Sequence, residues 1–495
     1  MHRFGTDERL NNYSEGEIRR RSLSMGIDAV LETLLPLLVD ASRRFAHDRA
    51  AQARQRAKEN FADYGLADPD SAGAPQFIAE AMFDRQFSRG SRKNYSKQLL
   101  CAQVAAAIEA GTPVRMAIPA LPFKIASPLK CRGHLPDLAE VNFLLDLYEI
   151  ALTVEILYGE RAGAAGAGAL AEFVVVSDGS RFSALVGESA AVVRHYRRGL
   201  TEWAERLGID DYVTIHDYGD LLSERLPAAA RARKAAIAAS AAADYAEVMC
   251  AVFDPNDMER TLRRAAEVEP DPERANPEGR FVSLLKSLVY TITYRALGRV
   301  HAPGSAAYCS LYREITAHLF TPYPAPSPTV PDLAASKDGE GEGLALPDSA
   351  KEALRREMLR EAWDATILYM AEIKSDRDLD EDPILTCLPG HIRWTIHAKR
   401  GQIAMAVPTV AGLTVQAWAG SAVFKRTKGG GLKLCTLPVV ALEGGGAIPV
   451  RVDDPQTVLG LGDQPLFYIY PDVEFEGMAD FLGQLATSLV RRRAW

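Results

Sequence analysis

The sequence has few cysteines, and no two of them lie close together. The six cysteines form no Cys-x-x-Cys pair and stand at positions 101, 131, 250, 309, 387 and 435. Such spacing argues against a disulfide framework and against a structural zinc site, because both need clustered cysteines. The cysteine usage therefore fits a reducing cytoplasm.

Long apolar runs and an excess of positive charge are also missing. No apolar run reaches the roughly 18 residues that a membrane span needs, and the segment Met1–Arg9 lacks the apolar core of a signal peptide. The formal net charge of −8 argues against nucleic acid as a partner, because duplex binders concentrate positive charge on one face. The chain as a whole is 47% hydrophobic and 25% charged, which is ordinary for a soluble globular enzyme.

Changes in composition along the 495 residues predict four segments. Residues 1–91 read as a helical N-terminal extension, with helical apolar spacing from Ile27 onward. Residues 92–320 form the first part of a catalytic core. Residues 321–348 are rich in proline, then acidic and rich in glycine, which is typical of a linker or insert. Residues 349–495 begin with a helix and continue as a β-rich remainder of the catalytic domain.

The stretch from Val114 to Glu140 gathers the most chemistry. An apolar run, 114–119, predicts a strand, and a proline-punctuated loop with Lys124, Lys130 and Arg132 follows it. Pro136 then fits the first turn of a long helix, where a missing N–H does no harm. Cations held in a loop between a strand and a helix suit an anionic small molecule, because open α/β sheets bind ligands at the carboxyl ends of their strands.

Acidic residues begin that helix. Asp137 and Glu140 stand three residues apart, on one face of its first turn, and they fit either general acid–base chemistry or simple stabilisation of the helix dipole. Further along, the apolar run 172–177 predicts a buried strand that breaks at Asp178-Gly179 and continues over 181–186. Asp178 fits an acid–base role or a turn equally well.

Four blocks of the sequence carry a resemblance to a known family. The first block contains Pro122-Phe-Lys124, Ser127-Pro128, Lys130, Gly133 and Leu135-Pro-Asp-Leu-Ala-Glu140; the others are Ser177-Asp-Gly179 with Phe182 and Leu185-Val-Gly187, then Tyr196, then Ile392-Arg393 with Ile396-His397. Over about residues 92–440 these blocks resemble the isonitrile (isocyanide) synthases of pyoverdine/dityrosine-type biosynthesis. The sequence departs from the family at Ala417-Trp418-Ala419, where Pro-Trp-His is usual.

The resemblance implies an α/β fold, a Rossmann-like mixed sheet flanked by helices, with a β-rich C-terminal part. It also implies an enzyme that condenses the amine of an amino acid, of the tyrosine or tryptophan type, with the keto carbon of ribulose 5-phosphate. The sugar carbon becomes the isonitrile carbon, and no cofactor or metal is implied. An iron/2-oxoglutarate oxygenase is the expected downstream partner in such a pathway.

That reaction needs anion-binding groups, acid–base groups and a carboxylate anchor. The expected catalytic residues are Lys130, Asp137, Glu140, Asp178 and His397, and the expected substrate-binding residues are Lys124, Ser127, Arg393, Arg181 and Trp418. Lysine suits phosphate as a compact charge, and arginine suits a carboxylate bidentately.

Each of these residues also has a structural interpretation. The lysines fit solvated loop cations, Arg393 and His397 fit structural ion pairs on one strand face, and Trp418 fits a core position. Two other functions also stay open: formation of an N-formyl amino acid or another sugar-phosphate condensation on the same scaffold, and non-catalytic binding of a phosphosugar or an amino acid.

Overall fold

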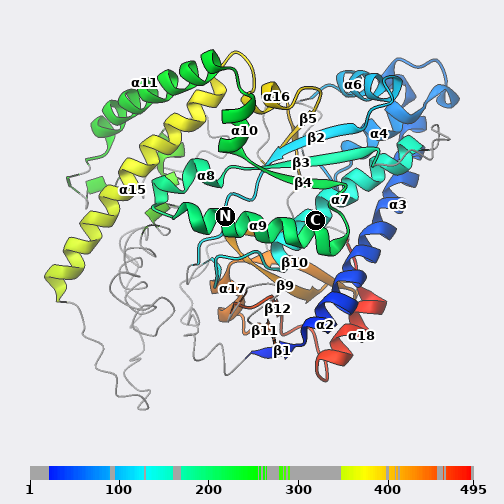
Figure 1. Ribbon diagram of the computed structural model, residues 1–495. Helices are drawn as coiled ribbons and strands as arrows, with labels where there is room; N and C mark the ends of the chain where they lie inside the picture. The colour runs from blue at the N-terminus through cyan, green and yellow to red at the C-terminus, as the bar shows by residue number, and fades with distance from the viewer. Residues whose placement is uncertain are drawn as a thin grey trace.

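The computed structural model describes residues 22–89, 95–126, 130–159, 169–254, 347–396, 401–406, 409–410, 413–453, 461 and 464–491, with isolated residues between 256 and 292. Of the predicted linker 321–348, only Pro347 and Asp348 fall among them. Two five-stranded sheets form the body of this part of the chain, with helices packed on and between them (Figure 1).

The first sheet is parallel and has a Rossmann-like strand order. Its strands lie in the order β4-β3-β2-β5-β6. They are β2 (Val114–Pro119), β3 (Ala171–Ser177), β4 (Val213–Asp217), β5 (Ile392–Thr395) and β6 (Ile403–Ala404). From β2 the chain proceeds outward to β3 and β4, whereas β5 and β6 fill the other side. The switch in direction therefore falls between β2 and β5, where doubly wound sheets bind ligands.

Helices cover both faces of this sheet, so its strands are apolar on both sides. One face packs against α7 (Leu138–Gly159) through residues such as Met116 and Phe173. The opposite face, with Ala117 and Val174, packs against α10 (Tyr218–Arg225) and α16 (Pro383–Cys387). The expected α/β class with a helix-flanked, Rossmann-like sheet is confirmed.

The second sheet is mixed and lies in the β-rich C-terminal part. Its order is β1-β11-β12-β9-β10. The strands are β1 (Leu23–Met25), β9 (Ser421–Arg426), β10 (Leu432–Leu437), β11 (Ile448–Val452) and β12 (Phe467–Ile469), and a separate pair joins β7 (Thr409–Val410) to β8 (Leu413–Thr414). β1 pairs in parallel with β11, so the N-terminal segment completes a sheet made otherwise from the end of the chain.

The central helix α7 lies between the two sheets and is buried almost all round. The sequence predicts only an apolar stripe along it, but Asp146 and Glu149 on its other faces are also buried. The long helix α3 (Leu35–Glu59) packs along α7, and α4 (Ala74–Met82) contacts both of them. Residues 22–89 are therefore packed into the same body as the sheets.

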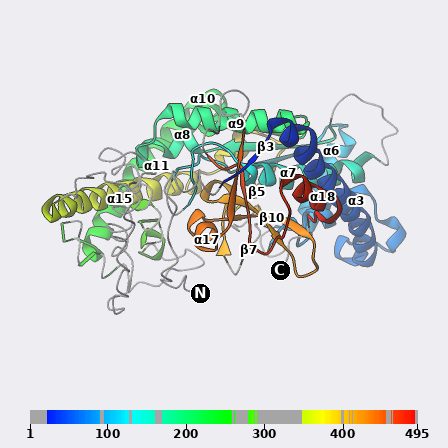
Figure 2. The same cartoon turned by 90° about the horizontal axis from the view of Figure 1, so that it is seen from below.

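Two long helices pack on each other and extend from one side of the body, as Figures 1 and 2 show. They are α11 (Ala228–Val252) and α15 (Asp348–Arg377). Within the described ranges, α11 is the one helix that is long and apolar enough to cross a membrane, and it qualifies by its length and composition alone. Lys234 of α11 pairs with Glu372 of α15 at 2.8 Å.

The remaining elements complete the connections around the sheets. They are the short α2 (Ile27–Ala29) and the π-helical turn η1 (Val30–Leu34) that lead into α3, the 3-10 turns η2 (Phe61–Tyr64) and η3 (Pro69–Ser71), α6 (Lys97–Glu109), α8 (Gly179–Phe182), the 3-10 turn η4 (Ala184–Val186), α9 (Ala190–Leu207), the 3-10 turn η6 (Ala417–Ala419), α17 (Val439–Gly444) and α18 (Met478–Ser488).

Two local expectations differ from the structure. Residues 181–186, expected to continue the strand, form the end of α8 and η4, because the chain turns at Asp178 into a helix that packs against α10. The sequence of β5 also predicts that Ile392 and Trp394 face one way and Arg393 and Thr395 the other, but the structure shows no such difference in burial. All four residues of β5 are buried, because the strand lies inside the sheet between β2 and β6.

Candidate functional site

The carboxyl ends of β2 and β3 are locked together just beyond the sheet. Leu121, which follows β2, has a positive φ of 55°, an uncommon conformation for a residue other than glycine. Its carbonyl accepts a hydrogen bond of 2.8 Å from Ser177 Oγ at the end of β3. A Cβ on Gly179 would lie 1.9 Å from the Pro122 carbonyl oxygen, so glycine is required there. The loop that follows β2 is thus held in one path.

That path brings Lys124 onto the acidic start of α7. The Lys124 Nζ lies 2.8 Å from Asp137 Oδ2 and 2.9 Å from Glu140 Oε2, and all three side chains are 0% exposed. The contact with Glu140 is a hydrogen bond. The contact with Asp137 is an ion pair outside hydrogen-bond geometry, which leaves Oδ2 without a hydrogen-bond donor. Three of the expected site residues therefore form one buried charge cluster.

The two carboxylates also cap the helix, so the structural interpretation holds alongside the cluster. Asp137 Oδ1 accepts from the Ala139 N–H at 2.7 Å, and Glu140 Oε2 accepts from the Asp137 N–H at 2.9 Å. This reciprocal arrangement is a variant of the capping box, in which Asp137 accepts from the second N–H of the helix rather than the third, and it satisfies N–H groups that a helix start leaves unpaired. The helix start thereby fixes both carboxylates in position against Lys124.

Burial and charge shift the pKa values in this cluster in different directions. Burial raises the pKa of Glu140 to about 7, and Asp137 adds to the rise, while Lys124 opposes it. Burial alone would lower the pKa of Lys124, but the neighbouring Asp137 and Glu140 outweigh it and the pKa is raised. Lys124 is consequently a fixed cation, and Glu140 is a carboxyl that exchanges its proton near neutral pH.

Tyr196 and Cys131 complete the cluster, and neither is among the predicted site residues. The Tyr196 hydroxyl donates to Glu140 Oε1 at 3.0 Å, and burial raises its pKa well above the usual value. The signal that was available for Tyr196 is its place in the family resemblance. The Cys131 thiol donates to the Ile125 carbonyl at 2.8 Å, and burial raises its pKa to about 12, so it remains a thiol.

Lys130 lies beside this cluster rather than within it. Its side chain is half-buried, and burial lowers its pKa. No carboxylate among the described residues forms an ion pair with it, in contrast to Lys124 and to Arg132, which pairs with buried Glu443. Its backbone carbonyl accepts from the Val439 N–H at 2.9 Å. Lys130 is therefore the loop cation whose charge is left for another anion.

Asp178 follows the carboxyl end of β3, and Arg393 is the second residue of the neighbouring strand β5. Burial raises the pKa of Asp178 to about 6, while Arg181 and Arg393 lower it. Arg393 is buried, and its Nε donates to Asp382 at 3.1 Å. Its NH1 donates to the Trp394 carbonyl. The guanidinium expected to hold a substrate carboxylate is thus already engaged with Asp382 in this structure.

Arg181 differs from the expectation that it binds substrate. Its guanidinium pairs with Asp376 at 2.6 Å and with Glu372 at 3.2 Å, and it packs over the rings of Phe182 and Tyr218. The side chain is only 10% exposed. Arg181 thereby joins α8 to α15, which is a structural role.

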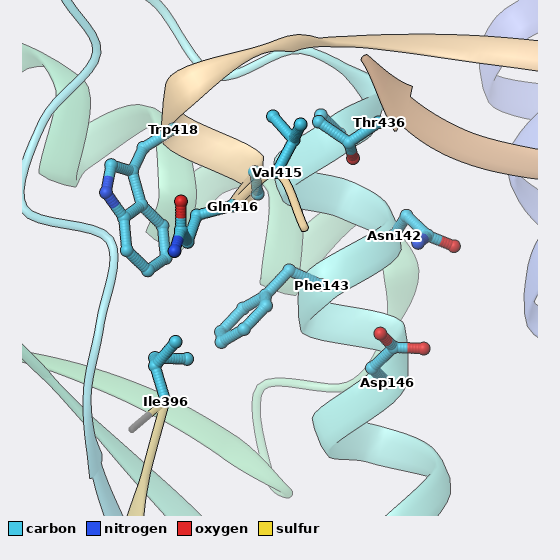
Figure 3. Close-up of a pocket in the computed structure, with 10 residues that line it drawn as sticks. Asn142, Phe143, Asp146, Ile396, Val415, Gln416, Trp418 and Thr436 are labelled. Atoms are coloured by element: carbon cyan, nitrogen blue, oxygen red, sulfur yellow. The ribbon is translucent and has the colours of Figure 1, made fainter. Parts of the chain in front are cut away.

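A small pocket opens along α7 (Figure 3), and its lining includes Ala139, the residue that precedes Glu140. Phe143 points into it, with Ile396 from the end of β5 and Trp418 from η6 on its other sides. The rings of Phe143 and Trp418 meet edge to face, with centroids 6.1 Å apart. The pocket is narrow, with a cavity volume of about 20 Å³, which is room for about one water molecule. Because successive helix residues are about 100° apart, Glu140 lies on the face of α7 adjacent to Phe143.

The polar wall of the pocket is held by Arg491. Asn142 and Asp146 line it, and Arg491 donates to Asn142 and pairs with Asp146 at 3.2 Å. The pocket is therefore mainly apolar and aromatic toward its interior.

Two predicted site residues, Ser127 and His397, lie outside the described residues.

Comparisons with known proteins find matches to the segment of the chain that carries the charge cluster. Residues 104–275 match the family model described as pyoverdine/dityrosine biosynthesis protein. The L-tyrosine isonitrile synthase of Pseudomonas aeruginosa is 32% identical over 112 residues, a match that spans 23% of this chain and 31% of that protein. The crystal structure of the PvcA protein from the same organism aligns with 80% of this chain and all of its own, at a TM-score of 0.40 and 20% identity.

Proposed function

We propose that this chain, whose residues 104–275 match the pyoverdine/dityrosine biosynthesis protein model, is an isonitrile synthase. Its substrates would be an aromatic amino acid and ribulose 5-phosphate. The observation that carries the proposal is the buried cluster of Lys124, Asp137, Glu140 and Tyr196 at the carboxyl edge of β2, beside an aromatic pocket.

The pocket supports an aromatic amino acid as one substrate. Phe143 and Trp418 present ring surfaces, and Ile396 adds an apolar wall. Aromatic rings favour edge-to-face or offset packing on one another, which stabilises such a pair beyond the area it buries. Because the cavity is only about 20 Å³, the pocket must widen to seat an aromatic side chain, by movement of half-exposed Trp418 away from Phe143.

Lys130 supports a phosphorylated second substrate. It is the loop cation that no described carboxylate neutralises, and it sits on the strand-to-helix loop where α/β sheets bind anions. A phosphate brought to it would gain a compact cation as a partner. Lys124 is unsuited to that role, because two buried carboxylates already balance its charge.

Glu140 supports the proton transfers of imine formation. When the amine nitrogen bonds to the keto carbon of the pentulose phosphate, the nitrogen loses its protons and the keto oxygen leaves as water. A carboxyl with a pKa of about 7 can accept and return such protons near neutral pH. The cluster is closed to solvent, so this role requires it to open toward the pocket when substrate binds.

Product detection tests the proposal. Purified protein is incubated with ribulose 5-phosphate and each aromatic amino acid, and an isonitrile is trapped with a tetrazine. Mass spectrometry separates the isonitrile from a formamide, which is heavier by one water. Folded protein that yields no isonitrile from any amino acid would refute the proposal, and a formamide as the first product would move it to N-formyl amino acid synthesis.

A further inference from the structure

Residues in the C-terminal part of the chain form hydrogen bonds with the loop that leads into the charge cluster. The Gln464 amide spans the backbone of Leu135, with Nε2 donating to its carbonyl at 2.8 Å and Oε1 accepting from its N–H at 3.2 Å. Two residues further on, the Leu466 carbonyl accepts from the Leu138 N–H at 3.1 Å. Leu135 and Leu138, on either side of Pro136-Asp137, are therefore hydrogen-bonded to the segment that precedes β12.

Gly133 provides the space in which Gln464 sits. A Cβ on Gly133 would lie 1.6 Å from Gln464 Oε1, a distance that no side chain tolerates. Its φ is not in the left-handed region, so the need for glycine comes from Gln464 and not from the backbone. Gln464 is 8% exposed, and its own N–H donates to the Leu461 carbonyl at 2.9 Å.

Further contacts extend the grip along the same loop. The Val439 N–H donates to the Lys130 carbonyl at 2.9 Å, and Arg132 Nε donates to Glu443 at 2.7 Å. Glu443 is buried and also accepts from the Tyr468 hydroxyl. The segment from Lys130 to Leu138 is thus attached at four places to α17 and to the residues just before β12, and Gln464 is the nearer to the start of α7 of the two side chains that attach it.

We propose that Gln464 is a positioning residue for the reaction at Glu140. By fixing both polar groups of Leu135 it sets where α7 begins, and the helix start sets where Asp137 and Glu140 meet Lys124. Displacement of a catalytic group by about 1 Å costs about 100-fold in rate. The catalytic consequence rests on the proposed function, whereas the mechanical consequence does not.

A double-mutant cycle tests the proposal without touching the cluster. The variants are Gly133→Ala, which displaces the Gln464 amide, Gln464→Ala, and the two combined. Gly483→Ala in α18 is the matched control, because its Cβ would meet nothing within 4 Å. We expect each single variant to lower kcat by about tenfold or more with little change in KM for the amino acid. The combined variant should match Gln464→Ala, because alanine at 464 leaves room for the new methyl group.

Two further readouts distinguish positioning from general stability. Gln464→Glu keeps the acceptor for the Leu135 N–H but loses the donor, so we expect partial recovery of kcat relative to Gln464→Ala. Amide hydrogen exchange of Leu135 and Leu138 should rise in Gly133→Ala and Gln464→Ala and stay unchanged in Gly483→Ala. Additive losses in the cycle, or unchanged exchange at these amides, would overturn the proposal. If the wild type makes no isonitrile while the exchange pattern holds, the proposed function fails and the positioning inference stands.

Discussion

The Lys124 ammonium lies 2.9 Å from Glu140 Oε2, and neither side chain has any exposed surface. Two residues 16 positions apart thus form a buried ion pair at the junction of a strand, a loop and a helix. Removing one member of such a pair is costly, because the charge left behind has no counter-charge and no water. The pair is therefore both a structural constraint and the centre of the proposed chemistry.

Glu140 should give the protein a pH-dependent stability. Burial raises the pKa of Glu140 from 4.5 to about 7, so the folded state keeps a proton that the unfolded state has lost. Its contribution to the free energy of unfolding is present below pH 4.5 and is lost as the pH rises to about 7. We expect Glu140→Gln to remove that loss, by a few kcal/mol at most. Urea unfolding of both proteins at intervals from pH 4 to 8 checks this, and parallel profiles would contradict it.

Tyr196 should tune the pH dependence of the reaction. Its hydroxyl donates to Glu140 Oε1 at 3.0 Å, and such a donor favours the ionised carboxylate. In Tyr196→Phe the pKa of Glu140 should therefore rise by about one pH unit, the shift that corresponds to about 1.4 kcal/mol. The limb of the kcat/KM profile assigned to Glu140 should move to higher pH by the same amount. An unmoved limb would show that Glu140 does not titrate in the rate-limiting proton transfer.

Lys130 and Arg132 should respond differently to substitution. Lys130→Ala removes the unpaired loop cation, so we expect KM for ribulose 5-phosphate to rise about tenfold or more, at a stability cost of about 0.5 kcal/mol or less. Arg132→Met is the control, because it removes the cation that balances the charge of buried Glu443 and should cost about 3–5 kcal/mol of stability. Steady-state kinetics and urea unfolding separate the two. A large stability loss in Lys130→Ala with unchanged KM would reverse the assignment.

Trp418 should govern which amino acid is accepted. It meets Phe143 edge to face at 6.1 Å across the pocket, and it is half-exposed. Trp418→Ala should raise KM for aromatic amino acids by about tenfold, which corresponds to about 1.4 kcal/mol of lost packing. Trp394, fully buried in β5 and outside the pocket, provides the control: Trp394→Phe should lower stability and leave the substrate preference unchanged. Equal effects of both substitutions on KM would argue against a substrate pocket at Trp418.

Much of the fold was predictable, because local sequence patterns determine many of its helices and strands. The strand at 114–119 matches the expected bounds, since a continuous apolar run marks it. The short strands β9 and β11 were missed, because each gains its place by pairing with distant segments. The prediction of a strand at 181–186 was wrong for a similar reason. Arg181 finds its partners 191 and 195 residues away on α15, and no local pattern reveals that.

The candidate site was predictable only in part. Asp137 and Glu140 follow the helix-start pattern, so their shared position was visible in the sequence. That Lys124 rather than Lys130 would pair with them depends on the path of the loop after Leu121, which the contact with Ser177 fixes. The role of Gln464 was also hidden, because 329 residues separate it from Leu135.

Isotope transfer tests the central claim most directly. Ribulose 5-phosphate labelled with ¹³C at its keto carbon is incubated with an aromatic amino acid and either the wild type or Glu140→Gln. Tetrazine trapping then shows where the label resides. The proposal predicts an isonitrile carbon fully labelled by the wild type and a product yield lowered at least about 100-fold by folded Glu140→Gln. An unlabelled isonitrile carbon, or equal yields from the two proteins, would contradict it.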